Sequence, residues 1–191
     1  MATAFLLVGL PAAGKTTRAR VLERERPALR LTTDAWVLRL FGGENPGPQR
    51  DAVEGLLLTT GLRAAALGVD VVLDFGFWSR AERDALRHVF GAAGVTCVVE
   101  HLDVAPDDQR ERVARRWDER PQDTFPISGD ELTAWRAVFE APDAAELRGG
   151  PVAAAPPAAS SWAAWATERW PGFDPSAATS LCVTQDTSGC V

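Results

Sequence analysis

GLPAAGKT, residues Gly9 to Thr16, is the stretch that decides the fold of this chain of 191 residues. It follows the pattern Gly-x4-Gly-Lys-Thr, in which a glycine-rich loop surrounds phosphate groups with its backbone N–H groups. The apolar run Ala4 to Val8 precedes it and has no polar face, which is typical of a buried parallel strand. Residues from Lys15 to about Arg26 favour a helix. The pattern therefore lies between a strand and the phosphate-attracting N-terminus of a helix.

Lys15 is the only lysine of the chain, whereas arginine is abundant. This indicates a composition bias that has replaced lysine wherever arginine serves. A compact ammonium group fits inside a phosphate-binding loop better than a planar guanidinium group. We expect Lys15 to reach the β- and γ-phosphates of a nucleotide and the Thr16 hydroxyl to bind Mg2+. The residues expected to hold the nucleotide here are Gly9, Pro11, Ala12, Ala13, Gly14, Lys15, Thr16 and Thr17.

The size and charge of the chain favour one soluble domain with a full core. A net charge of −6 argues against broad nucleic-acid binding, which usually needs a basic surface. No apolar stretch is long enough to span a bilayer, and a core strand at the start leaves no space for a signal peptide. Cys97 falls in a predicted strand, while Cys182 and Cys190 lack metal-ligand spacing with histidines. We therefore expect a cytoplasmic protein with reduced thiols and no membrane partner.

Apolar runs and helical patterns alternate along the chain, which predicts an α/β fold with a central parallel sheet. With the phosphate-binding loop, this indicates the three-layer sandwich of P-loop NTPases with a helical lid. Strands are expected at residues 4–8, 29–32, 69–73 and 95–101, and helices at 15–26, 34–41, 50–67, 80–93, 106–117 and 131–140. Residues 152–155 are a candidate fifth strand.

Two aspartates are expected at the ends of neighbouring strands, where ligands bind in open parallel sheets. Asp34 follows the second strand in LTTDAW, and Asp74 follows the third in VVLDFG. Asp74 is the predicted carboxylate for Mg2+. Asp34 is the predicted general base on an acceptor hydroxyl, although aspartate there also suits a helix N-cap.

Four arginines cluster in the predicted helix 106–117 and just after it. Arg112, Arg116 and Arg120 recur at a spacing of four and are expected to share one helical face, with Arg115 beside them. Such a run is often a solvated face. Here it precedes a polar, proline-bearing segment, which is typical of a lid that brings positive charge to a transferring phosphoryl group. Arg116 and Arg112 are the favoured catalytic candidates, and Arg120 is a candidate for binding the nucleotide.

These motifs together resemble a known group of enzymes. GLPAAGKTT, LTTDAW, VVLDFGFWSRAERDALR, the arginine-rich helix and FEAPDAAEL resemble the P-loop kinases of the AAA-type, zeta-toxin and polynucleotide-kinase group, which includes chloramphenicol phosphotransferase-like enzymes. The resemblance covers about residues 4–147. It implies ATP and Mg2+ as cofactors, Asp34 as base and a lid arginine between residues 112 and 120. In polynucleotide kinases an arginine closely follows the base and grips the substrate phosphate, whereas Arg39 lies farther on here.

The resemblance also suggests domain boundaries. Residues 1–148 are expected to form the P-loop kinase domain, with the lid at about residues 112–130. Residues 149–161 form a predicted Pro- and Ala-rich linker. Residues 162–191 form a C-terminal segment that contains Trp162, Trp165 and Trp170 and ends in a flexible tail from residue 171 onward.

Members of this group phosphorylate hydroxyls on nucleic-acid 5′ ends, UDP-sugars and antibiotics, so three functions remain open. The leading hypothesis is an ATP-dependent kinase that transfers the γ-phosphoryl group to a hydroxyl of a metabolite or antibiotic. The second is a polynucleotide 5′-hydroxyl kinase, which the acidic charge disfavours. The third is a nucleotide-dependent binding or switch module, which needs no base.

Overall fold

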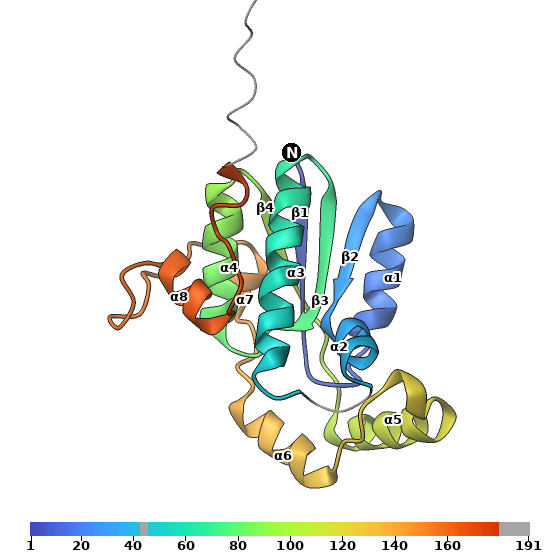
Figure 1. The fold of residues 1–191 in the computed structure, drawn as a ribbon. Helices are drawn as coiled ribbons and strands as arrows, with labels where there is room; N and C mark the ends of the chain where they lie inside the picture. The colour runs from blue at the N-terminus through green and yellow to red at the C-terminus, as the bar shows by residue number, and fades with distance from the viewer. Residues whose placement is uncertain (43–45, 180–191) are drawn as a thin grey trace, which may run out of the picture.

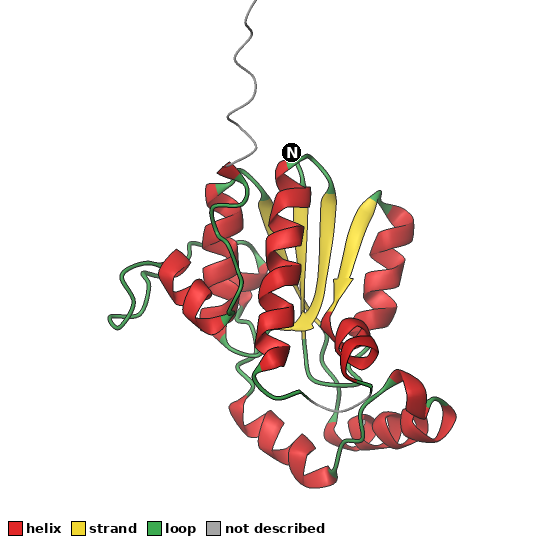
Figure 2. Cartoon of the chain, in the orientation of Figure 1, coloured by secondary structure: helices red, strands yellow, loops and turns green. Residues whose placement is uncertain are grey.

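The computed structural model describes residues 1–42 and 46–179 and shows a central sheet between two layers of helices (Figures 1 and 2). The sheet is built from four strands in the described part of the chain: β1 (Thr3–Val8), β2 (Ala28–Thr32), β3 (Asp70–Gly76) and β4 (Thr96–His101). They lie in the order β2-β3-β1-β4, and each neighbouring pair is parallel. The predicted α/β fold with a parallel sheet is confirmed.

The first six α-helices follow the predicted alternation, with ends that differ by a few residues. Their bounds are α1 Lys15–Glu25, α2 Thr33–Phe41, α3 Gln49–Ala66, α4 Arg80–Ala92, α5 Pro106–Glu119, α6 Gly129–Val138, α7 Ala144–Leu147 and α8 Trp162–Arg169, with the 3-10 helix η1 at Pro121–Asp123. Helices α5 and α6 lie beyond the carboxyl ends of the strands, at the bottom of the view (Figure 1). No helix among the described residues is long and apolar enough to cross a membrane.

The two faces of the sheet are covered by different helices because side chains alternate along each strand. Phe5 and Leu7 of β1 pack with Leu22 of α1 in the smaller core. Leu6 and Val8 point to the opposite face, where α3, α4 and α8 supply the larger core. Both faces are thus buried, which explains why β1 reads as a continuous apolar run.

Three local predictions need correction. Strand β3 continues to Gly76, so Asp74 lies inside the strand instead of after it. Residues 152–155 form no strand. Helix α5 ends at Glu119, and Arg120 has a non-helical backbone (φ −148°, ψ 62°) because the residue before a proline avoids the helical region. The predicted arginine face therefore ends at Arg116.

Residues 162–179, which we call the C-terminal segment, belong to the larger core. Trp170 is 1% exposed, and Phe173 and Ala177 are also buried. The rings of Phe77 and Phe173 contact Trp170 edge-on at centroid distances of 6.5 and 6.3 Å. The interpretation of residues 171–191 as a flexible tail is therefore wrong for residues 171–179. Residues 180–191, with Cys182 and Cys190, lie outside the described residues.

Candidate active site

The loop after β1 has the geometry of an anion-binding loop. Gly9 (φ +151°), Ala12 (φ +62°) and Gly14 (φ +99°) have positive φ values, which glycine adopts without a steric penalty. A Cβ atom on Gly9 would lie 2.4 Å from the carbonyl oxygen of Leu102, so the close approach of the chain after β4 also requires glycine. Gly14 is the N-cap of α1 and provides no capping side chain, so the first N–H groups of α1 are left for a ligand.

The ammonium group of Lys15 is turned into this loop. Its Nζ atom donates hydrogen bonds to the carbonyl oxygens of Gly9 at 2.8 Å and Leu10 at 2.9 Å. Burial lowers the pKa of Lys15, and the carboxylates of Asp74 and Asp34 oppose that shift. The fold therefore brings the predicted lysine and both predicted acids within electrostatic reach of one another.

Asp74 is buried in β3 and contacts the other residue predicted to bind the metal. Its carboxylate accepts hydrogen bonds from the hydroxyl groups of Thr16 and Thr32, the latter at 3.4 Å. Burial raises the pKa of Asp74, whereas the Thr16 hydrogen bond and the Lys15 charge lower it.

Hydroxyl and carboxylate oxygens suit Mg2+, which typically takes only one or two protein ligands beside phosphates and water. Residues 1–42 and 46–179 contain no cluster of three or more His, Cys, Asp and Glu side chains that could enclose a metal. The contact between Thr16 and Asp74 supplies two oxygen ligands of the kind that Mg2+ takes together with a nucleotide.

Asp34 has a partner that the sequence analysis missed. It is the second residue of α2, and its Oδ1 atom accepts a hydrogen bond from Nη2 of Arg50 at 2.6 Å. Arg50 is the second residue of α3, which contacts α2. A cation in the first turn of a helix interacts unfavourably with the helix dipole. The position of Arg50 at the start of a predicted helix is therefore the signal in the sequence that this side chain has another role.

Two of the four candidate lid arginines lie near the phosphate-binding loop. Nη1 of Arg112 donates to the carbonyl oxygen of Ala12 at 3.4 Å. Nη2 of Arg116 donates to the carbonyl oxygen of Asp123 at 2.8 Å, and its charge is close enough to help lower the pKa of Lys15. Arg115 pairs with Glu111 on the same helix at 3.9 Å, and Arg120 is exposed. Of the four arginines, Arg112 and Arg116 are thus the two that these contacts place near the loop.

Hydrogen bonds through Gln109 join α5 and α6 to the phosphate-binding loop, and no local sequence pattern predicts them. Gln109 of α5 is 1% exposed, and its Nε2 donates to the carbonyl oxygen of Pro11 at 2.9 Å. Its Oε1 accepts from Nε of Arg136 on α6 at 2.8 Å, and Nη2 of Arg136 donates to the carbonyl oxygen of Val104 at 2.7 Å. Helices α5 and α6 are therefore fastened to each other and to the phosphate-binding loop.

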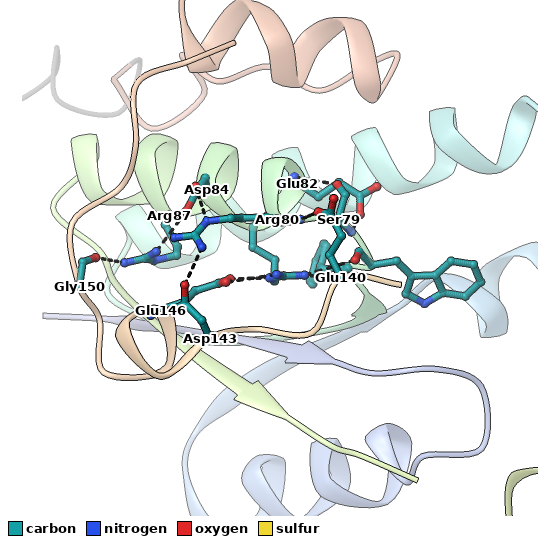
Figure 3. Close-up of polar contacts among 12 residues, drawn as sticks. Ser79, Arg80, Glu82, Asp84, Arg87, Glu140, Asp143, Glu146 and Gly150 are labelled. Atoms are coloured by element: carbon teal, nitrogen blue, oxygen red, sulfur yellow. Dashed lines mark hydrogen bonds and ion pairs between the residues drawn. The ribbon is translucent and has the colours of Figure 1, made fainter. Parts of the chain in front are cut away.

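The chain that leaves the lid is fastened to α4 by arginines (Figure 3). Arg80 donates from its backbone to Glu140 and from Nη1 to Asp143, both at 2.6 Å. Arg83 forms a buried bidentate pair with Glu146, and Arg87 donates to the carbonyl oxygen of Gly150. Arg80 therefore holds the chain after α6 at Glu140 and Asp143.

Behind Asp34 lies a buried acid, Glu54 of α3. Its carboxylate is 3.4 Å from Nε of Arg50 and 4.0 Å from Nη2 of Arg169. Nε1 of Trp170 donates to it at 3.1 Å. Burial raises the pKa of Glu54 to about 7, although Arg50 and Arg169 act in the opposite direction.

Glu54 will make the protein less stable as the pH rises towards 7. A carboxyl whose pKa is raised on folding stabilises the native state fully below its unfolded pKa, and that stabilisation is lost as pH rises through the folded value. Between about pH 5.5 and about pH 8 this contribution corresponds to about 2 kcal/mol. Urea unfolding at both pH values measures it, with Glu54→Gln as the control that lacks the titration. If the free energy of unfolding depended on pH in the same way in both proteins, the raised pKa of Glu54 would be contradicted.

Together, the parallel sheet, the glycine-rich loop after β1, the acids at β2 and β3 and the helices beyond them define a nucleotide-binding protein of the P-loop class. The chain belongs to the AAA domain family, whose model matches residues 5–142. No curated protein matches it.

Several solved structures share this fold. The Pnkp1/Rnl/Hen1 RNA repair complex contains a chain that matches with a TM-score of 0.61 at 18% identity, covering 71% of this chain but only 43% of that one. Chaetomium thermophilum Kti12 in complex with ADP-AlF3 matches with a TM-score of 0.53 at 20% identity, covering 73% of this chain and 81% of that one. A sugar kinase from Janibacter sp. HTCC2649 matches with a TM-score of 0.52 at 17% identity, covering 75% of this chain and 81% of that one. At these identities the likeness concerns the fold, and together with the family match it supports the resemblance to the P-loop kinase group.

Proposed function

We propose that this protein is an ATP-dependent phosphotransferase that moves the γ-phosphoryl group of ATP to a hydroxyl group of a small-molecule acceptor. The observation that carries the proposal is the juxtaposition of Lys15, Asp74 and Asp34, which come from the carboxyl ends of neighbouring strands. They supply an ammonium group for phosphates, an acid for a metal and a half-exposed carboxylate for an acceptor. Transfer to a hydroxyl needs these three groups.

In this reaction Asp34 takes the proton of the acceptor hydroxyl as the acceptor oxygen forms a bond to the γ-phosphorus. The bond from that phosphorus to the oxygen that bridges the β- and γ-phosphates breaks, and ADP leaves. Lys15 and the N–H groups of the loop from Gly9 to Thr17 bind the phosphates. Thr16 and Asp74 would hold Mg2+, whose charge offsets that of the phosphate oxygens. Arg112 and Arg116, with Arg120 beyond them, would add positive charge from the lid.

A polynucleotide 5′-hydroxyl kinase is the second candidate. The observation in its favour is the match to a chain of the Pnkp1/Rnl/Hen1 RNA repair complex. The net charge of −6 counts against it, because nucleic-acid binding usually needs a basic surface. A small molecule is therefore the favoured acceptor.

The two candidates are separated by where the phosphoryl group goes. The protein is incubated with Mg2+ and γ-labelled ATP, beside either a small-molecule metabolite extract or a 5′-hydroxyl oligonucleotide, with Lys15→Ala as the inactive control. Label in a small molecule is the expected result. Label on the oligonucleotide alone would assign the second function. Nucleotide binding without label in either pool would contradict both and favour a switch module.

The lid arginine Arg116 will matter for the rate more than for nucleotide binding. Arg116→Ala is expected to slow transfer roughly 10²-fold, because positive charge is most effective on the transition state. The dissociation constant of ADP, measured by calorimetry, should change much less. Arg110→Ala is the matched control, since Arg110 is exposed on the same helix and pairs with Asp107. Equal losses in rate and in ADP affinity would contradict the lid role.

A further inference from the structure

A continuous line of polar contacts runs from the candidate base into the C-terminal segment. Arg50 donates from Nη2 to Asp34 at 2.6 Å, and its Nε lies 3.4 Å from Oε1 of Glu54. Nε1 of Trp170 donates to Oε2 of the same carboxylate at 3.1 Å. The side-chain exposure falls along this line from 47% at Asp34 through 29% at Arg50 to 11% at Glu54. The line therefore begins at the open site and ends in the core.

Arg169 fixes the far end of this line. It precedes Trp170 and bonds to acids on two other helices: Asp51 of α3 at 2.8 Å and Glu82 of α4 at 2.7 Å. Its guanidinium group also lies over the Trp170 ring, 5.4 Å from the ring centroid. These contacts determine where the Trp170 indole stands relative to Glu54.

The C-terminal segment lies directly on α3 at Gly55. A Cβ atom at this position would be 2.4 Å from the carbonyl oxygen of Pro171 and 2.8 Å from the backbone nitrogen of Phe173. One turn further along α3, Oγ1 of Thr59 donates to the carbonyl oxygen of Gly172 at 3.2 Å. Glycine at position 55 thus permits an approach that any side chain would prevent, immediately beside Glu54.

We propose that Arg50 is a positioning residue for Asp34 and that the C-terminal segment, through Trp170, Arg169 and Glu54, holds Arg50 in place. This rests on the proposed role of Asp34 as general base. The family match ends at residue 142, so the segment that completes this support lies outside the matched residues.

The physical reason for this support is that an exposed ion pair alone does not hold a side chain in one position. Asp34 is half exposed, and such pairs are screened by water and lose side-chain entropy when they form. The guanidinium group of Arg50 is planar with donors in fixed directions, so holding its Nε atom also fixes the direction of Nη2. Glu54 pairs with Nε from a buried position, and Nη2 of the same rigid group then meets Asp34. A base must lie within hydrogen-bond reach of the proton that it removes, so this support acts on the rate.

The first test uses Glu54→Gln, which keeps the size and shape of the side chain. Phosphate release from Mg–ATP is the readout, with water as the probe acceptor, and ADP binding is measured by calorimetry. We expect kcat to fall roughly 10-fold to 10²-fold, the range for misplacing a reacting group, with ADP affinity unchanged. In the Asp34→Asn background, Glu54→Gln should lower kcat by less than about 2-fold, because the effects of residues that act through one another are not additive.

The second test displaces the C-terminal segment without changing any charged residue. Gly55→Ala places a methyl group against Pro171 and Phe173, whereas Gly91→Ala adds the same methyl group to α4 with no atom within 4 Å. Amide hydrogen exchange in α2, which carries Asp34, needs no turnover. We expect exchange over residues 33–38 to become several-fold faster in Gly55→Ala and to stay unchanged in Gly91→Ala.

The outcomes separate this inference from the proposed function. A wild-type rate in Asp34→Asn would refute the base role itself. A slow Asp34→Asn with equal Glu54→Gln effects in both backgrounds would refute only the positioning role. An unchanged rate in a folded Glu54→Gln protein, or unchanged exchange over residues 33–38 in Gly55→Ala, would also overturn it.

Discussion

Replacing Lys15 with alanine will abolish ATP turnover and leave the fold intact. Its Nζ atom bonds the carbonyl oxygens of Gly9 and Leu10 inside the phosphate-binding loop, and the side chain belongs to neither hydrophobic core. Without it, the β- and γ-phosphates lose their closest positive charge. Phosphate release measures the loss, and thermal unfolding should show a melting temperature close to that of the wild type.

Lys15→Arg tests why this lysine persists in an arginine-rich chain. The ammonium group lies 2.8 and 2.9 Å from two backbone carbonyl oxygens, a space that a planar guanidinium group overfills. We expect this variant to be strongly impaired as well. Arg24→Ala, an exposed position on the same helix, is the control and should retain the wild-type rate. Full activity in Lys15→Arg would show that the interpretation of the single lysine is wrong.

Replacing Asp34 with asparagine should slow phosphoryl transfer by roughly 10²–10⁴-fold, the usual contribution of a general base. Asparagine retains an oxygen that can accept the hydrogen bond from Arg50, so the local structure should persist. ADP affinity is therefore expected to change little. Single-turnover rates and calorimetry measure the two quantities separately.

Asp74→Asn is the contrasting variant, because it removes the acid that contacts Thr16. We expect its main effect on the Mg2+ concentration that is needed for activity. If Asp34→Asn lost rate and nucleotide affinity equally, Asp34 would have a metal-binding or structural role. If it lost neither, a nucleotide-dependent switch without an acceptor would be the better description.

Local pattern identified much of the candidate site. Gly9 and Gly14 are needed where the backbone has positive φ, and such positions leave a direct signature in the sequence. Parallel strands place their carboxyl ends at one edge, so residues that follow different strands are expected to meet. Lys15, Asp34 and Asp74 came together for this reason. Strand β3 nevertheless continued past Asp74 to Gly76, because hydrogen bonding to β1 sets the end of the strand.

The sequence alone determined the parallel α/β fold, the phosphate-binding loop and the approximate places of its two acids, because each depends on contacts between near neighbours or on a repeating pattern. The tertiary structure alone decided what supports them. Arg50 meets Asp34 across 16 positions, Gln109 meets Pro11 across 98, and Trp170 meets Glu54 across 116. Such contacts depend on how whole helices pack on the sheet, and side-chain packing between distant segments leaves no periodic trace in a single sequence. Residues 171–179 were misread as a flexible tail for the same reason: Gly55 lets their backbone pack on α3.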